Sequence, residues 1–273
     1  MLLKELENTN QKFVEQMKKE RGVLGAWYFG SLSHDNADKY SDIDIVFLLD
    51  DENFERIDKE RQNIMKKTGA EIVVEWAEEF NDDAIKNYCY ILNVAGKNFQ
   101  YDVFMLNQNR LDEFMCQIHY ADMTESDIIF EKGKNVSALL GHNGCKDTWK
   151  ADVHRLIQTY WFHVHMTAKY LARKDYFKLE GVLRILMDTH SSLLLTQYDR
   201  ITWGGTANKL HFIPEDKQKH LMKYGCIDDF DQIKQNLLEA MDWFIEDSKG
   251  LQDKNEIDYC VKTGEKIKKH YCM

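Results

Sequence analysis

Hydrophobic and polar positions follow different patterns in the two halves of the chain. In the first half, strand-like spacing occurs at residues 27–29, 42–49, 71–76, 88–94, 99–106 and 128–130, and helical spacing at 2–19, 55–67 and 111–120. From residue 153 onward, apolar residues recur at helical intervals. The pattern predicts an α+β fold, with a mixed β-sheet flanked by helices over residues 1–140 and an all-helical domain over residues 141–273.

Two aspartates lie on one face of the second predicted strand. Ser41-Asp42-Ile43-Asp44-Ile45 alternates polar and apolar residues, and successive strand residues face opposite sides of a sheet. Asp42 and Asp44 therefore share a face, while Ile43 and Ile45 point into the core. Two like charges this close are costly unless a cation lies between them. The strand indicates a site for a divalent metal ion.

A glycine turn comes directly before this acidic strand. Trp27-Tyr28-Phe29 leads into Gly30-Ser31, where the missing side chain lets phosphate oxygens approach backbone N–H groups. The Ser31 hydroxyl either contacts phosphate or only forms the turn, and we favour contact. Gly30 and Ser31 are therefore predicted to hold phosphate next to the metal site.

A third carboxylate comes from a predicted β-hairpin whose strands flank Ala95-Gly96-Lys97-Asn98. Asp102 interrupts the otherwise apolar strand 101–106, where a charge without a partner is expensive. If this strand lies beside residues 42–49, Asp102 completes the metal-binding cluster or acts as a general base. Glu75 is the second candidate base, although strand acids more often face solvent.

Composition limits the classes of partner and compartment. The 273 residues carry a formal charge of −10, which argues against a broad nucleic-acid surface and suits a cationic small molecule or a metal-bound nucleotide. Six scattered cysteines without a CxxC pair, and no signal peptide, predict a cytoplasmic protein. No apolar run approaches the ~20 residues that a bilayer span needs.

Together, the Gly30-Ser31 turn, the Asp42-Ile43-Asp44 strand and the later Asp102 resemble the DNA polymerase β-like nucleotidyltransferase superfamily over about residues 25–106. The resemblance implies that Gly30 and Ser31 hold the phosphates of a nucleotide. It also implies that Asp42 and Asp44 bind Mg²⁺, and that Asp102 is a further ligand or the general base.

A closer resemblance, to bacterial aminoglycoside 6-adenylyltransferases, extends into the second half. It includes the hairpin, Tyr160-Trp161, and the segment from Ala168-Lys169 to Arg173. Two positions depart from that family: Leu32 follows Ser31 where the family has arginine, and Thr159 replaces an acid. These departures support the wider subfamily better than modification of a 6-hydroxyl, and leave lincosamide nucleotidyltransferases open.

The implied reaction is transfer of AMP from ATP, or of another nucleotide from its triphosphate, to a hydroxyl of a small cationic acceptor such as an aminoglycoside. Two Mg²⁺ ions and release of pyrophosphate are expected. Lys169 and Arg173, one helical turn apart, either meet the triphosphate or form a solvated helix face. Tyr160 and Trp161 either stack on a ligand or belong to the core, and core is favoured. A non-catalytic antitoxin or binding module is the alternative of another class.

Overall fold

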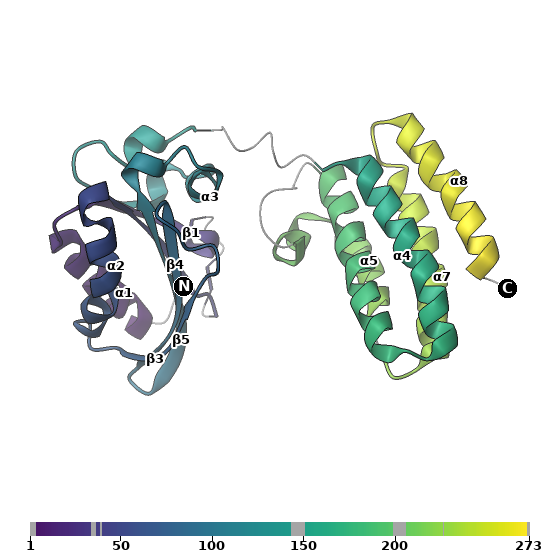
Figure 1. Ribbon diagram of the computed structural model, residues 1–273, viewed down its shortest axis with the longest axis horizontal. Helices are drawn as coiled ribbons and strands as arrows, with labels where there is room; N and C mark the ends of the chain where they lie inside the picture. The colour runs from purple at the N-terminus through teal and green to yellow at the C-terminus, as the bar shows by residue number, and fades with distance from the viewer. Residues whose placement is uncertain are drawn as a thin grey trace. The chain divides into compact units, whose positions relative to one another are not determined.

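The computed structural model describes residues 4–33, 37–38, 40–142, 151–198, 206–225 and 227–271. The chain forms two compact units, residues 1–147 and 148–273 (Figure 1). This division falls a few residues after the predicted boundary at 140/141. The functional roles expected of the two parts, catalysis and substrate binding, stay predictions.

Unit 1 contains a mixed sheet, as predicted. Its strands, among the described residues, are arranged in the order β3-β4-β5-β2-β1-β6. β2 and β5 are parallel and the other neighbours are antiparallel. The bounds are β1 Val23–Phe29, β2 Ile43–Leu49, β3 Glu71–Ala77, β4 Ile85–Val94, β5 Lys97–Asn107 and β6 Ile128–Glu131.

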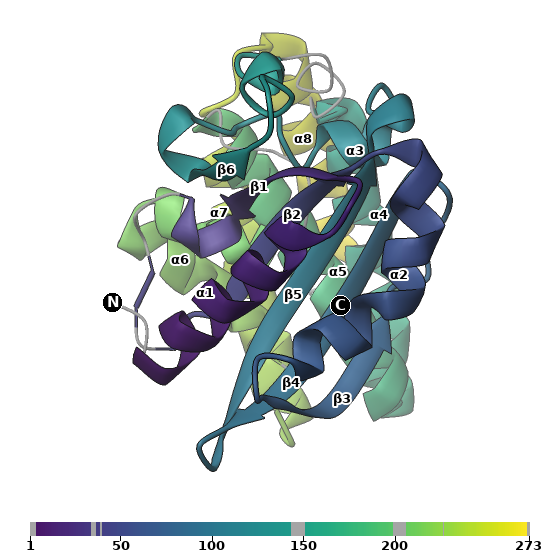
Figure 2. The same cartoon turned by 90° about the vertical axis from the view of Figure 1, so that its left-hand side faces the viewer.

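Two amphipathic helices, α1 (Lys4–Lys19) and α2 (Asp51–Lys66), cover one face of this sheet, which Figure 2 views from the helix side. The buried residues of alternating strand positions, such as Ile43, Ile45 and Phe47, pack beneath them. α2 begins earlier than the predicted residue 55, because the Asp50 carboxylate accepts a hydrogen bond from the Asn53 backbone and caps the helix.

The other sheet face is covered only in part. Val46, Leu48 and Phe104 pack there against a segment that contains the short helix α3 (Phe114–Gln117). The helix predicted over 111–120 is thus mostly turns. The segment is attached to β1, because the Trp27 indole donates a hydrogen bond to the His119 backbone carbonyl at 2.8 Å. Single 3₁₀ turns complete the unit at η1 Gly30–Leu32, η2 Gln108–Arg110, η3 Glu125–Asp127 and η4 Ser137–Leu139.

Unit 2 is helical throughout its described residues, as predicted. Tyr160 and Trp161 are fully buried in its core, and the Tyr160 ring stacks on Phe244 at 3.5 Å between centroids. Stacking of these two residues on a ligand is therefore excluded. The elements are α4 Val153–Arg173, α5 Tyr176–Gln197, η6 Thr206–Phe212, α6 Glu215–Leu221, η7 Met222–Tyr224, α7 Phe230–Ser248 and α8 Lys254–Tyr271.

A buried ionic cluster ties four helical elements of unit 2 together. The Asp247 carboxylate on α7 accepts hydrogen bonds from His190 Nε2 at 2.9 Å and from Lys217 Nζ on α6. His190 Nδ1 lies 2.9 Å from the Tyr224 hydroxyl, so both ring nitrogens have partners. Burial alone raises the pKa of Asp247, but the bonds from His190 and Lys217 outweigh it and lower that pKa to about 2.

None of the helices in the described ranges is both long and apolar enough to cross a membrane.

Candidate active site

Three aspartates, one on β2, one on β5 and one just before β2, meet on the sheet face opposite α1 and α2. In the parallel pairing of β2 with β5, Asp44 lies directly beside Asp102. Asp42 comes two residues before Asp44 and so lies on the same face. One carboxylate oxygen of each aspartate lies within 4.8 Å of the others. The predicted convergence of Asp42, Asp44 and Asp102 is therefore present in the fold.

The glycine turn lies against this carboxylate cluster. Phe29 is the partner of Asp44 in the β1–β2 ladder, so Gly30 follows immediately beside it. Gly30 has φ +65°, and a Cβ atom there would lie 2.3 Å from Asp44 Oδ2. Both the left-handed backbone and the close carboxylate require glycine. The chain then enters the η1 turn, where the Ser33 amide donates to the Gly30 carbonyl.

Two buried polar atoms at the site have no hydrogen-bond partner among the described residues, Ser31 Oγ and Asp102 Oδ1. Buried polar atoms are normally paired, so each of these is suited to a ligand that the chain itself does not supply. The other oxygen of Asp102 accepts a hydrogen bond from the Gln100 amide at 3.0 Å. Ser31 and Asp102 thus each present one unused oxygen at the site.

The crowding of negative charge changes the protonation of the cluster. Burial, followed by the charges of Asp42 and Asp102, raises the pKa of Asp44 to about 8. Burial also raises the pKa of Asp102, against the effect of its hydrogen bond from Gln100. Carboxylate oxygens are the preferred ligands of hard divalent cations, which would relieve this repulsion. The three aspartates are therefore a fitting ligand set for Mg²⁺.

Glu75, the second candidate for a general base, lies on the opposite face of the sheet. Its carboxylate pairs with Arg61 of α2 at 2.7 Å, and the Arg61 guanidinium lies over the Tyr88 ring. The expectation that Glu75 faces solvent is wrong, because α2 covers it. Since Glu75 and Asp102 are separated by the sheet, Glu75 is not part of the carboxylate cluster.

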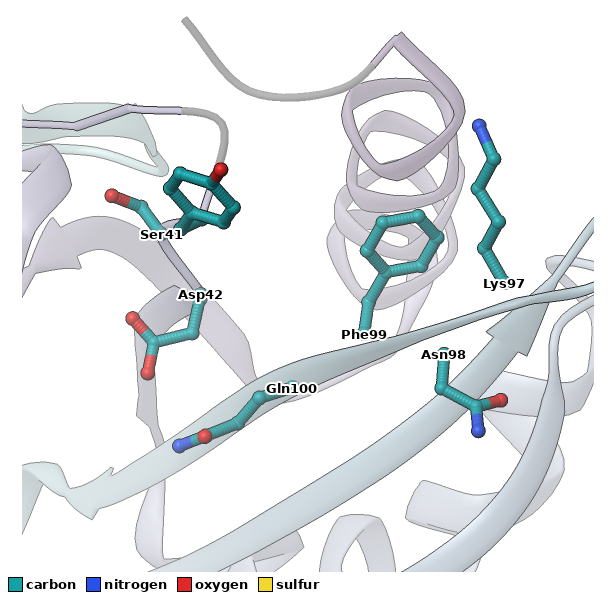
Figure 3. A pocket seen from close by; sticks show the side chains of 7 residues that line it. Ser41, Asp42, Lys97, Asn98, Phe99 and Gln100 are labelled. Carbon is teal, nitrogen blue, oxygen red and sulfur yellow. The ribbon is translucent and has the colours of Figure 1, made fainter.

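A pocket of about 490 Å³ opens beside Asp42. It is lined by residues of the segment before β2 and by the first residues of β5, and Figure 3 shows Asn98 and Gln100 on one side of β5 and Phe99 on the other. Asp42 lines the pocket, and the Gln100 amide, which also lines it, donates a hydrogen bond to Asp102, so the pocket borders the carboxylate cluster. Gln100 carries no signal in the sequence, because only the register of the hairpin shows that it shares a face with Asp102.

Lys169 and Arg173 belong to unit 2. Both are exposed and lie one turn apart near the end of α4, and Lys169 Nζ lies 5.0 Å from the centroid of the Tyr170 ring. The spacing predicted for a joint contact with phosphate is present. The contact itself stays a prediction.

The model of the family described as "Nucleotidyltransferase domain" matches residues 11–92. The chain carries a nucleotidyltransferase domain. The matched segment includes the Gly30 turn, Asp42 and Asp44, and it ends before Asp102. The predicted superfamily is confirmed for this domain, and Asp102 is joined to it by the β2–β5 register.

Two solved structures are similar to the chain at low identity. One is a nucleotidyltransferase-like protein from Exiguobacterium sibiricum 255-15, with 11% identity and a TM-score of 0.31 over 96% of this chain and 77% of that one. The other is spectinomycin adenyltransferase AAD(9) from Enterococcus faecialis, solved with ATP and spectinomycin, with 12% identity and a TM-score of 0.32 over 97% and 98%. At these TM-scores neither likeness carries an argument about the substrate. A search of curated proteins finds no match.

Proposed function

We propose that the nucleotidyltransferase domain transfers a nucleoside monophosphate, AMP from ATP, to a hydroxyl group of a small cationic acceptor such as an aminoglycoside. The observation that carries this proposal is the convergence of Asp42, Asp44 and Asp102 within 4.8 Å, beside a glycine turn with an unused serine hydroxyl. A carboxylate cluster next to a phosphate-binding turn is the arrangement that metal-dependent transfer of a nucleotidyl group needs.

Asp42, Asp44 and Asp102 would hold the divalent cations, two Mg²⁺ ions in the full proposal. When bound, Mg²⁺ neutralises charge on the triphosphate and polarises the α-phosphoryl group. The backbone N–H groups after Gly30 and the Ser31 hydroxyl would orient the phosphates from the β1 side of the cluster. Lys169 and Arg173 are the proposed cationic contacts from unit 2.

Asp102 is the proposed general base. The acceptor hydroxyl oxygen forms a bond to the α-phosphorus, the bond from that phosphorus to the β-phosphate oxygen breaks, and pyrophosphate leaves. The hydroxyl proton passes to Asp102, whose pKa is raised by burial and whose Oδ1 has no other described partner. A raised pKa makes this carboxylate a better proton acceptor once it is ionised.

The proposed acceptor is cationic because it must approach a cluster of three carboxylates in a protein with a formal charge of −10. Its class follows from the resemblance to aminoglycoside 6-adenylyltransferases. The same chemistry suits other aminated small molecules, including lincosamides. A cytoplasmic location, where ATP and Mg²⁺ are available, completes the proposal.

The test is pyrophosphate release by the purified protein with Mg²⁺, each of the four common nucleoside triphosphates, and a panel of aminoglycosides and lincosamides. We expect acceptor-dependent release with at least one aminoglycoside, and ATP as the best donor. Release with lincosamides alone would support the other acceptor class. No release with any acceptor, together with no binding of Mg-nucleotide, would support a non-catalytic binding module.

A further inference from the structure

The sheet face beyond Asp102 continues as an open surface toward the edge strand. A row of directly paired residues runs across it, from Asp44 on β2 to Asp102 on β5, Cys89 on β4 and Trp76 on β3. Directly paired strand residues share a face, so the Trp76 side chain lies on the carboxylate side of the sheet. Two strand spacings place Trp76 about 10 Å from Asp102.

Trp76 is unusually exposed for an indole. It is 63% exposed, and Val74, which pairs with Ile91 on the same face, is 49% exposed. A tryptophan and an aliphatic side chain held outward on a paired strand form an apolar surface, and burying that surface against a ligand is favourable. The α3 segment packs on this face over β1, β2, Phe104 of β5 and Ile85 at the start of β4, whereas Val74 and Trp76 of β3 stay largely exposed.

Negative charge borders this surface on both sides. Asp102 lies at one end, and Glu78 follows β3 with its backbone amide bonded to the Asn87 carbonyl. Cys89 in the middle of the row pairs directly with Asp102, and Glu78 comes two residues after Trp76, so alternation places it on the same face. Within the described ranges no ion pair forms at Glu78. An indole face between two carboxylates suits a cation.

The order of strands also indicates which of the two reactants would approach the cluster over this surface. In-line displacement at phosphorus puts the attacking and leaving oxygens on opposite sides. The Gly30 turn holds the β1 side of the cluster, where the phosphates and the departing pyrophosphate belong. The acceptor must then approach from the β5 side, which is where Cys89 and Trp76 lie.

We propose that Trp76, Val74 and Glu78 form the acceptor platform, a surface that binds an aminated ring of the acceptor and presents its hydroxyl to Asp102. The ring packs on the Trp76 indole, and its ammonium groups face Glu78. This proposal rests on the proposed function, and it makes Trp76 and Glu78 determinants of specificity for cationic rings.

Calorimetric binding of kanamycin, streptomycin and spectinomycin to the full chain, with Mg²⁺ and a non-hydrolysable ATP analogue present, tests the platform. We expect Trp76→Ala to weaken the binding of the best probe roughly tenfold and Trp76→Phe to restore part of it, since an aromatic face attracts cations. Glu78→Gln weakens binding and lowers its dependence on salt. Glu79→Gln, the same change on the next and exposed residue, is the control and leaves binding unchanged.

Binding of the ATP analogue is the second readout, and it stays at the wild-type value in all four variants. Because Trp76 is largely exposed, the melting temperature of Trp76→Ala stays near that of wild type. Unchanged probe binding in Trp76→Ala overturns the platform while the transferase proposal stands. Binding of the probes without any pyrophosphate release supports the platform and overturns the transferase proposal. If none of the probes binds wild type, the platform is overturned whatever the turnover.

Discussion

Asp44 and Asp102 lie side by side across the parallel pairing of β2 and β5, although β3 and β4 separate them in the sequence. This adjacency brings a third carboxylate to the Asp42-Ile43-Asp44 segment, and burial together with the charges of Asp42 and Asp102 raises the pKa of Asp44 to about 8. The carboxylate cluster therefore destabilises the fold when no metal ion is bound. A divalent cation bound by the native state would offset that repulsion.

Asp44→Asn is expected to stabilise the metal-free protein while abolishing transfer. An unfolded aspartate has a pKa near 3.9, and the folded value is about 8, so wild-type stability falls as the pH rises from about 4 to 8. The Asp44→Asn variant lacks this loss of stability and should gain roughly 5 kcal/mol at pH 8 and nothing below pH 4. Urea unfolding with EDTA at both pH values measures it, and an equal gain at both would contradict the electrostatic cause.

Gly30→Ala is expected to damage the site more than the same change at another glycine with positive φ. A Cβ at Gly30 would lie 2.3 Å from Asp44 Oδ2, whereas one at Gly96 has no atom within 4 Å. Gly96→Ala therefore carries only the backbone strain of about 1 kcal/mol, and Gly30→Ala adds displacement of the Asp44 carboxylate. Affinity for Mg-nucleotide, compared between the two variants, checks this. Equal affinities would show that the contact does not matter.

The buried cluster around Asp247 should make the helical unit sensitive to acid. Its folded pKa is about 2 against about 3.9 unfolded, so its stabilisation is present above pH 4 and is lost as the pH falls toward 2. Asp247→Asn leaves Lys217 and His190 without their anion and should cost roughly 3 kcal/mol at pH 7. The control is Asp242→Asn on the same helix, whose largely exposed carboxylate pairs with Lys268 alone among the described residues. Urea unfolding of both variants should differ clearly, and similar losses would refute the assignment.

Glu75→Gln should unfold more readily but retain transfer, because Glu75 pairs with Arg61 on the face away from the cluster. Losing a partly buried ion pair costs roughly 1 kcal/mol. Melting temperature and acceptor-dependent pyrophosphate release at saturating substrates separate the two effects. Loss of turnover in a folded variant would return Glu75 to the candidates for the general base.

How much the sequence predicts depends on whether a feature is local. Alternation along a single strand was enough to place Asp42 and Asp44 on one face, and a charge inside an apolar strand was enough to single out Asp102. The sequence does not show which residues of different strands share a face of the sheet. A bulge between Ile72 and Val74 shifts the β3 register, so Ile72 pairs with Leu92 toward the helices, while Val74 and Trp76 face the carboxylates. Without that register, the Trp76 surface could not be found.

The helical second half of the chain shows the same limit: local patterns were predicted, and long-range contacts were not. Helical periodicity predicted its helices and favoured a core position for Tyr160 and Trp161, and both are buried. The cluster of Asp247, His190 and Lys217 joins three separate helices, so its members have no local pattern that marks them as partners. Long-range polar contacts of this kind emerge only from packing.

The most direct test of the central claim is acceptor-dependent pyrophosphate release by wild type and by Asp102→Asn, with binding of Mg-nucleotide measured on the same samples. Removing a general base lowers turnover by roughly a hundredfold or more. We expect release by wild type, and in Asp102→Asn a loss of at least that size in a folded protein that still binds nucleotide at Asp42, Asp44 and the Gly30 turn. Undiminished release by Asp102→Asn would contradict it.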